Sequence, residues 1–465
     1  MQADATALAA AIGKGDVSAR QAMEASLAAS DAWAHLGALC GRDPETGLAA
    51  ADWFDGLSAD EKAAMAFGGV PTLAKDLGGP FAGLAVTAGS RALAGGDAGA
   101  DSDIAARFRD AGFSLFGLTT SPEFGLSLAS EPAKGPICRN PLDESRSPGG
   151  SSGGAAAAVA AGIVSIAHAT DAGGSIRVPA ACCGLVGLKP SRGAMPAGPA
   201  YGNYLGGIAT ELAVCRSVRD ADGVFRAIAG NARGPFPPPA FADVPEGSLR
   251  IGVLTETDVS ADPARLGGVE DAAKALEARG HRLRPVGWAE IETPARASAS
   301  AFADIAAANL AETTSRFGLD LEMVEPMTRA VIERGRAMRP EGVWSLINEM
   351  ALIARDLWRL FEGIDCLICP MLTDQPKPVG SFPTDHDDWP LHFERMRAFA
   401  PLAALANLSG FPAITLPFGA DGDGLPLPVQ LIAPMGAEAV LLRLAGELEN
   451  ENRWQHRFAI AGACA

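Results

Sequence analysis

The first half of the chain changes its hydrophobic pattern near residue 66. Residues 1–65 are alanine-rich and predict N-terminal helices, the first two of which are short and joined at residues 13–16. From residue 66 to 230, short apolar runs such as residues 113–118 and 163–167 alternate with glycine-rich turns and helical stretches. This alternation favours an α/β fold, in which helices cover a sheet.

The second half returns to strands after a long helical stretch. A proline-rich segment, residues 235–239, breaks the chain, and a strand is expected directly after it at residues 249–254. Residues 268–362 are amphipathic and predict several helices. Residues 363–465 return to the sheet. Two strands are expected there, at 414–416 and 429–432, followed by a closing helix at 437–449. Because strands flank the helical block, we expect one domain over residues 1–465 with a helical cap inserted.

The acidic composition of the chain argues against nucleic acid and anionic membranes as binding partners. The chain has 465 residues, with 38 Lys and Arg against 55 Asp and Glu, so its formal charge is −17. An acidic protein binds nucleic acid and anionic membranes poorly, and we expect neither as a partner. The first residues lack a basic segment followed by an apolar core, and the apolar run 154–167 is too short to span a bilayer. We therefore expect a cytoplasmic protein, as a monomer or a homodimer.

The eight cysteines are expected to be free thiols in a reducing compartment. Cys366 and Cys369 have the spacing of a redox motif or of half a zinc site. They lie in an apolar run that predicts a buried strand, and neither a second such pair nor a matching histidine pair follows. Structural thiols are favoured over metal or redox use, and no metal is expected.

Two glycine-rich segments carry the strongest chemical signal. Residues 147–154 (SPGGSSGG) precede a helical alanine run, and the exposed N–H groups at a helix N-terminus attract negative charge. A phosphate cradle or a flexible turn is the alternative, although the ending of a P-loop is missing. Residues 170–177 (TDAGGSIR) follow an apolar strand. Glycines there allow several N–H groups to point at one oxyanion.

A serine in these loops is a nucleophile only if a base lies within reach. His168 is the one histidine near them, but its apolar neighbours favour a hydrogen-bonded core residue. Lys75 ends an apolar strand ahead of a Gly-Gly turn. Burial there would lower its pKa enough for it to act as a base, whereas an ordinary lysine at a strand end is a solvated surface charge.

Taken together, these segments resemble the amidase signature family. The resemblance rests on Lys75 and Asp76, on residues 148–154 and 170–177, and on residues 183–190 (CGLVGLKP), with weaker matches at 216–220 and 407–412. It covers nearly the whole chain. It implies the family's fold: a large, mixed, twisted sheet covered on both faces by helices, with a helical region that caps the substrate.

The resemblance also implies roles for individual residues. The family's Ser–cis-Ser–Lys triad falls on Ser175 as the nucleophile, Ser151 as the bridging serine and Lys75 as the base, with the peptide bond before Ser151 cis. The family's oxyanion hole is made of backbone N–H groups, which here belong to Ala172, Gly173, Gly174 and Ser175. The side chains that support the loops in the family correspond to Ser152, Thr170, Asp171 and Arg177. No cofactor is implied.

The expected reaction is hydrolysis of the carboxamide C–N bond of a small uncharged aryl or alkyl substrate, linear or cyclic, with water and through an acyl-enzyme. Esters and carbamates are expected as further substrates. The resemblance favours free-standing bacterial amidases, and the alternative is the glutaminase subunit of a tRNA-dependent amidotransferase. Residues that flank the signature loops are candidates for the substrate pocket, with ordinary packing as the alternative: Phe124, Gly125, Leu126, Tyr201 and Tyr204.

Overall fold

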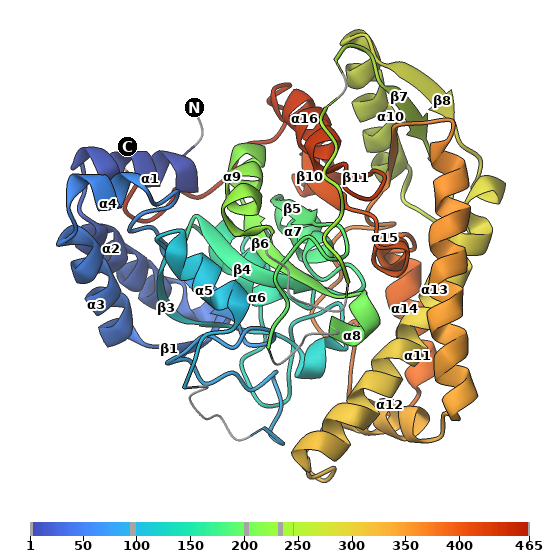
Figure 1. Cartoon of the computed structure of the whole chain (residues 1–465), viewed down its shortest axis with the longest axis horizontal. Helices are drawn as coiled ribbons and strands as arrows, with labels where there is room; N and C mark the ends of the chain where they lie inside the picture. The colour runs from blue at the N-terminus through green and yellow to red at the C-terminus, as the bar shows by residue number, and fades with distance from the viewer. Residues whose placement is uncertain (1–2, 94–98, 200–203, 231–235, 245, 464–465) are drawn as a thin grey trace.

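The computed structural model describes residues 3–93, 99–199, 204–230, 236–244 and 246–463. Its centre is a mixed eight-stranded sheet in the order β4-β6-β5-β10-β11-β9-β7-β8 (Figure 1). β7 pairs in parallel with β8 and β9, and the other neighbours are antiparallel. The strands are β4 (Ile166–Asp171), β5 (Val186–Lys189), β6 (Thr210–Cys215), β7 (Arg250–Val253), β8 (Arg282–Pro285), β9 (Cys366–Pro370), β10 (Ala413–Ala420) and β11 (Pro426–Ile432).

A second, three-stranded sheet lies beside β4. It consists of β1 (Leu39–Arg42), β3 (Ser114–Thr119) and β2 (Pro71–Lys75), with β2 and β3 parallel and β1 antiparallel. The Thr72 hydroxyl donates to the Ile166 carbonyl over 2.9 Å and so joins β2 to the large sheet. The carboxyl ends of β2 and β4 therefore come together, and both carry candidate residues.

Helices pack around both sheets. Several begin with a side-chain cap, as in α2, where the Ser18 hydroxyl accepts the Gln21 N–H and the Gln21 side chain accepts the Ser18 N–H in return. The α-helices are α1 (Ala5–Lys14), α2 (Ala19–Ala32), α3 (Pro44–Asp55), α4 (Ala59–Ala63), α5 (Asp103–Asp110), α6 (Gly153–Ala160), α7 (Arg177–Cys183), α8 (Tyr204–Gly207), α9 (Val218–Ile228), α10 (Pro263–Ala278), α11 (Glu292–Phe317), α12 (Pro326–Arg336), α13 (Pro340–Phe361), α14 (Trp389–Phe399), α15 (Ala403–Ser409) and α16 (Glu438–Glu449).

Helix α6 lies in the core, and all eight of its residues are buried. Its sequence, GGAAAAVA, contains only small residues, which let the helix backbone approach its neighbours closely. A Cβ atom on Gly154 would lie 2.4 Å from the Thr120 backbone nitrogen and 2.5 Å from the Ala38 carbonyl oxygen. The glycine-rich loop before α6 is thus held against the three-stranded sheet.

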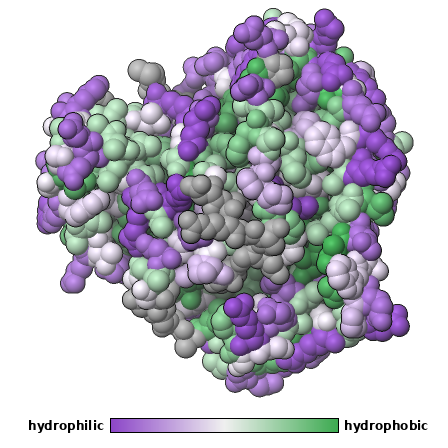
Figure 2. Space-filling model, in the orientation of Figure 1, coloured by the Kyte–Doolittle hydropathy of each residue, from purple (hydrophilic) through white to green (hydrophobic). Residues whose placement is uncertain are grey.

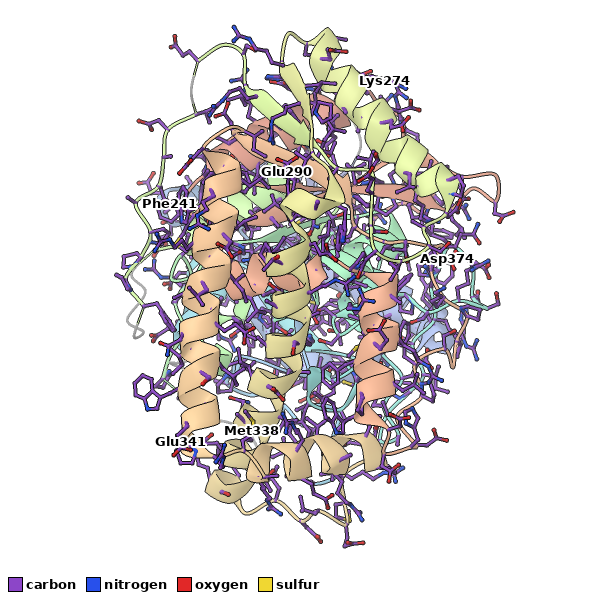
Figure 3. All side chains as sticks on the ribbon, turned by 90° about the vertical axis from the view of Figure 1, so that its right-hand side faces the viewer. Phe241, Lys274, Glu290, Met338, Glu341 and Asp374 are labelled. Carbon is purple, nitrogen blue, oxygen red and sulfur yellow. The ribbon has the colours of Figure 1, made fainter. Side chains whose placement is uncertain are left out.

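Helices α11, α13 and α14 stand side by side on one flank of the molecule, and α12 crosses below them (Figure 3). The expectation that residues 268–362 are helical is wrong at β8. That strand contains Arg282 and Arg284 and has no buried residue, so it lacks the apolar run that marks a core strand. The same reason explains β1, a half-exposed strand within the expected N-terminal helices.

The visible surface carries both polar and apolar residues. In the orientation of Figure 2, hydrophilic residues surround the rim, and hydrophobic residues gather between them. Within the described ranges, every helix is either too short or too polar to cross a bilayer.

Candidate active site

Lys75 ends β2 in the interior and is fully buried. Its ammonium nitrogen lies 2.7 Å from the Ser151 hydroxyl and 2.8 Å from the Thr170 hydroxyl. Burial lowers the pKa of Lys75 to about 7, although the carboxylates of Asp171, Glu211 and Asp76 act in the opposite direction. Lys75 is therefore buried beside Ser151, as expected, and is not a solvated surface charge.

The loop before α6 presents Ser151 to this amine. The Gly150–Ser151 peptide bond is cis, as expected. The Ser130 hydroxyl shares its one hydrogen between the carbonyls of Gly149 and Ser151, and its oxygen accepts the Gly153 N–H. One side chain therefore holds the backbone of the turn at three residues. Gly150 has no room for a side chain, because a Cβ there would lie 2.6 Å from the Ser127 carbonyl oxygen.

The second loop follows β4 and carries Ser175. The Ser152 N–H donates to the Ser175 carbonyl over 3.3 Å, and the Ser152 hydroxyl exchanges hydrogen bonds with the backbone of Thr170. Ser175 is 8% exposed and lines a cavity, whereas Ser151 is 2% exposed. In the described part of the chain, no hydrogen bond links the two serine hydroxyls.

Asp171 organises the backbone of this loop. Its carboxylate accepts the N–H groups of Gly174 and Ile176 and pairs with the Arg177 guanidinium at 2.9 Å. Burial alone would raise the pKa of Asp171, but the ion pair with Arg177 holds it well below its ordinary value. The Gly174 N–H therefore already donates to the Asp171 carboxylate. The N–H groups of Ala172, Gly173 and Ser175 donate to no protein acceptor in the described ranges.

Two further residues complete this network. The Arg177 guanidinium donates to the side-chain oxygens of Gln430 and Asn407, each over 2.6 Å. The Asn407 amide donates in turn to the Asp171 carboxylate and to the Ile208 carbonyl. The loop is thus tied to α15 and β11, more than 200 residues away. The sequence indicated Asn407 only as a weak family match and gave no signal for Gln430.

The cavity beside Ser175 is mainly apolar. Phe302 of α11 and Phe393 of α14 form part of its wall, with their ring centroids 5.9 Å apart. Among the described residues of the wall, Arg397 is the only charged one, and the carboxylates of Asp258 and Glu394 both bind it. The remaining lining residues are Gly125, Leu126, Leu128, Gly173, Ala299, Met396, Ala400, Pro401, Ala403 and Ala404.

Some of the residues predicted to line the substrate pocket line the cavity beside Ser175, and others do not. Gly125 and Leu126 line the cavity. Phe124 packs on the apolar cluster that α11 and α12 form with Leu126. Tyr201 lies outside the described residues, and for Tyr204, which begins α8, only the backbone is described. The aromatic wall from α11 and α14 was missed, because its contacts join segments more than 100 residues from the signature loops.

Cys366 and Cys369 lie in the buried strand β9, as expected. Gln430 donates to the Cys369 sulfur over 3.4 Å, and burial raises the pKa of the Cys369 thiol to about 12. Among the described residues, no three His, Cys, Asp or Glu side chains gather as metal ligands would. These facts support structural thiols. His168 is likewise a buried, hydrogen-bonded core residue, as predicted.

Comparison with known proteins gives the same family as the sequence. A family model for amidases matches residues 21–442. The 6-aminohexanoate-cyclic-dimer hydrolase of Paenarthrobacter ureafaciens is 33% identical over 98% of this chain and 96% of its own. The putative amidase AmiC of Mycobacterium tuberculosis is 35% identical over 97% and 95%.

Solved structures agree with these relatives. A 6-aminohexanoate cyclic dimer hydrolase complexed with substrate superposes with a TM-score of 0.89 at 31% identity, over 98% of both chains. A peptide amidase in complex with chymostatin has a TM-score of 0.78 at 25% identity, over 98% and 99%. An aryl acylamidase shares the fold, with a TM-score of 0.82 at 23% identity over 97% and 96%. The chain therefore belongs to the amidase signature family and is an amide hydrolase.

Proposed function

We propose that this amidase cleaves small uncharged amides through an acyl-enzyme on Ser175, with Ser151 and Lys75 as its proton relay. The observation that carries the proposal is the 2.7 Å contact between the buried Lys75 amine and the Ser151 hydroxyl. A pKa near 7 leaves a large fraction of this amine neutral at neutral pH, as a general base requires. Ser175 is the serine that faces the cavity, so it is the nucleophile.

Acylation follows from this arrangement. Neutral Lys75 takes a proton from Ser151, and Ser151 takes one from Ser175 as the Ser175 oxygen attacks the substrate carbonyl carbon. The two serine hydroxyls must come together for this step, which commonly happens only when substrate binds. The N–H groups of Ala172, Gly173 and Ser175, which have no acceptor among the described residues, donate to the resulting oxyanion, while the bond between Gly174 and Asp171 keeps them in place.

The same relay completes the reaction. The proton on Lys75 passes through Ser151 to the leaving nitrogen, the C–N bond breaks, and the acyl group remains on Ser175 as an ester. Water then attacks that ester and gives a proton through Ser151 to Lys75. The bond between the acyl carbon and the Ser175 oxygen breaks, the relay returns the proton to that oxygen, and the carboxylic acid and free Ser175 are released. Every proton is carried by the chain's own residues, so the proposal needs no cofactor or metal.

The cavity supports an uncharged substrate. Its wall is apolar, and Asp258 and Glu394 already neutralise its cation, Arg397. Backbone N–H groups recognise only the carbonyl oxygen, so esters and carbamates belong to the proposal as well. Since similar proteins are named hydrolases of the 6-aminohexanoate cyclic dimer, a cyclic amide of that kind is the first substrate to test.

We also propose one domain over residues 1–465, with residues 268–362 as the cap over the site. Support comes from α11, which lies within these residues and supplies Ala299 and Phe302 to the cavity wall.

Free glutamine is the substrate of the alternative, the amidotransferase subunit. It carries two charges, and the mainly apolar wall of the cavity suits it poorly.

The test is a substrate panel with the purified protein. The panel contains the 6-aminohexanoate cyclic dimer, an uncharged anilide, an aryl ester, an aryl carbamate and free glutamine. We expect hydrolysis of the uncharged substrates, and a fall of at least about 10³-fold in Ser175→Ala. Ser165→Ala is the matched control, because the hydroxyl of this buried serine has no hydrogen-bond partner in the described structure and the residue lies outside the site. A marked preference for glutamine would favour the amidotransferase alternative.

A further inference from the structure

A buried histidine–glutamate pair lies directly behind the proposed base. His168 of β4 is fully buried, and Glu211 of β6 is 2% exposed. The His168 Nε2 atom lies 2.6 Å from a Glu211 carboxylate oxygen, and that same oxygen accepts the Gly79 N–H over 3.1 Å. The rings of Phe81 and Phe108 pack against the imidazole in edge-to-face arrangements, with centroid distances of 5.0 and 5.4 Å.

The hydrogen bonds indicate which nitrogen of the His168 imidazole carries the proton. The Lys75 backbone N–H donates to His168 Nδ1 over 3.2 Å, so Nδ1 carries no proton. The imidazole proton must then be on Nε2, where it is donated to the Glu211 carboxylate. One Glu211 oxygen thus accepts two hydrogen bonds, from His168 Nε2 and from the Gly79 N–H.

The strand register explains how this pair reaches Lys75. In the antiparallel ladder of β4 and β6, Thr170 is opposite Glu211, and His168 is opposite Ala213. His168 and Thr170 are two residues apart, so they point to the same face of the sheet as Glu211. This face holds Lys75 twice, at its backbone through His168 and at its amine through Thr170.

Three carboxylates act on the Lys75 amine, and they come from different elements. Asp171, at the end of β4, is paired with Arg177, and Asp76, which follows β2, is hydrogen-bonded by the Thr87 hydroxyl and the Gly89 N–H. Glu211, on β6, is bound only by groups without charge. The residues of β3 and α6 that pack here contribute no charged side chain. Asp76 and Glu211 are thus both buried without an ion pair to Arg or Lys in the described structure, and Glu211 is the one that also contacts the histidine that holds the Lys75 backbone.

We propose that His168 and Glu211 are positioning residues for the base: His168 holds the strand end that carries Lys75, and Glu211 keeps a fixed negative charge behind it that sets the pH range of the enzyme. The inference rests on the proposed role of Lys75. A negative charge favours the protonated amine, so Glu211 partly offsets the lowering of the Lys75 pKa by burial.

The first test is the pH profile of kcat/KM for Glu211→Gln on an uncharged amide. Glutamine keeps the shape and an acceptor oxygen but removes the charge. The Lys75 pKa should then fall, and the acid limb of the profile should move to lower pH by about one unit. Glu438→Gln is the matched control: Glu438 is also buried and accepts the Ser191 N–H, but it does not act on Lys75, so its acid limb should stay in place.

The second test separates position from charge. His168→Gln keeps a side-chain N–H for Glu211 but has no acceptor at the position of Nδ1, which binds the Lys75 N–H. Because the charge remains, the acid limb should stay at its wild-type pH. Because the base is less well placed, kcat should fall by about tenfold to a hundredfold with little change in KM. Circular dichroism establishes that each variant is folded, and His168→Gln decides alone if Glu211→Gln is not.

These outcomes keep the two proposals apart. An acid limb that does not move in folded Glu211→Gln, or a wild-type kcat in His168→Gln, overturns the role of the pair while the relay stands. A wild-type enzyme with no acid limb at all contradicts Lys75 as the base, and the role of the pair falls with it.

Discussion

At the scale of single residues, the site depends on one lysine whose side chain is removed from water. Lys75 has hydroxyl partners at both of its side-chain contacts, Ser151 and Thr170, and no carboxylate of the described residues binds its amine directly. An ion pair would keep the amine charged, whereas hydroxyl partners accept either form. The residue types around Lys75 therefore suit an amine that gains and loses a proton in each turnover.

The activity should follow the neutral form of Lys75. Burial lowers the Lys75 pKa to about 7, so the neutral fraction rises through this value as the pH increases. Between pH 5 and pH 7 we expect kcat/KM to rise about fiftyfold and then to level off above pH 8. Initial rates on an uncharged amide across this range, with chemistry rate-limiting, provide the measurement. A flat profile from pH 5 to pH 9 would argue against a lysine base.

Replacing the lysine should affect amides more than activated esters. Lys75→Ala removes both the base and the source of the proton for the leaving group, and general acid–base catalysis is worth about 10²–10⁴-fold. An amide nitrogen must be protonated to leave, while an aryl oxide leaves without help. We expect the loss on an anilide to exceed the loss on a matched aryl ester. Equal losses under conditions that limit acylation would contradict this role of the relay.

At the scale of elements, the site depends on how closely α6 packs. The helix brings its backbone against Thr120 and Ala38, which only glycine at position 154 permits. Gly154→Ala should therefore lower the free energy of unfolding by about 1–3 kcal/mol through overpacking.

A matched control is available in the same chain. Gly13 lies within α1 and is exposed, and a Cβ added there would have no other atom within 4 Å. Gly13→Ala should raise the free energy of unfolding by up to about 1 kcal/mol, because alanine is the better helix former. Urea unfolding of both variants measures the difference. Equal effects of the two substitutions would mean that the close packing of α6 has no energetic consequence.

Local sequence predicted the elements that bear the site but not their surroundings. The ends of β2 and β4 are marked by apolar runs that stop at Lys75 and Asp171, and the turn before α6 is marked by the glycines around Ser151. The cavity wall from Phe302 and Phe393 depends on tertiary contacts that leave no local pattern. The same is true of Glu211, which reaches His168 only through the pairing of β4 with β6.

At the scale of the whole molecule, the net charge of −17 acts on the substrate before it reaches the cavity. An anionic amide should be cleaved with a kcat/KM at least about tenfold below that of a neutral substrate of equal size. Salt screens this repulsion, so the ratio should shrink between about 10 mM and about 500 mM salt. Equal rates for both substrates at low salt would show that a local positive charge outweighs the global one.

The proposed relay needs no metal, so a chelator should not change the rate. We expect activity after dialysis against EDTA to match that of the untreated protein. Loss of activity that zinc restores would contradict the proposal and return attention to Cys366 and Cys369.

The central claim is that Ser175 carries the acyl group. The most direct measurement is peptide mapping by mass spectrometry after the enzyme is quenched in acid during turnover of a slowly deacylating aryl ester. We expect one added acyl group on the peptide that contains Ser175 in the wild-type enzyme, and none in Ser175→Ala. An acyl group on another residue, or steady hydrolysis of amides by Ser175→Ala at the wild-type rate, would contradict it.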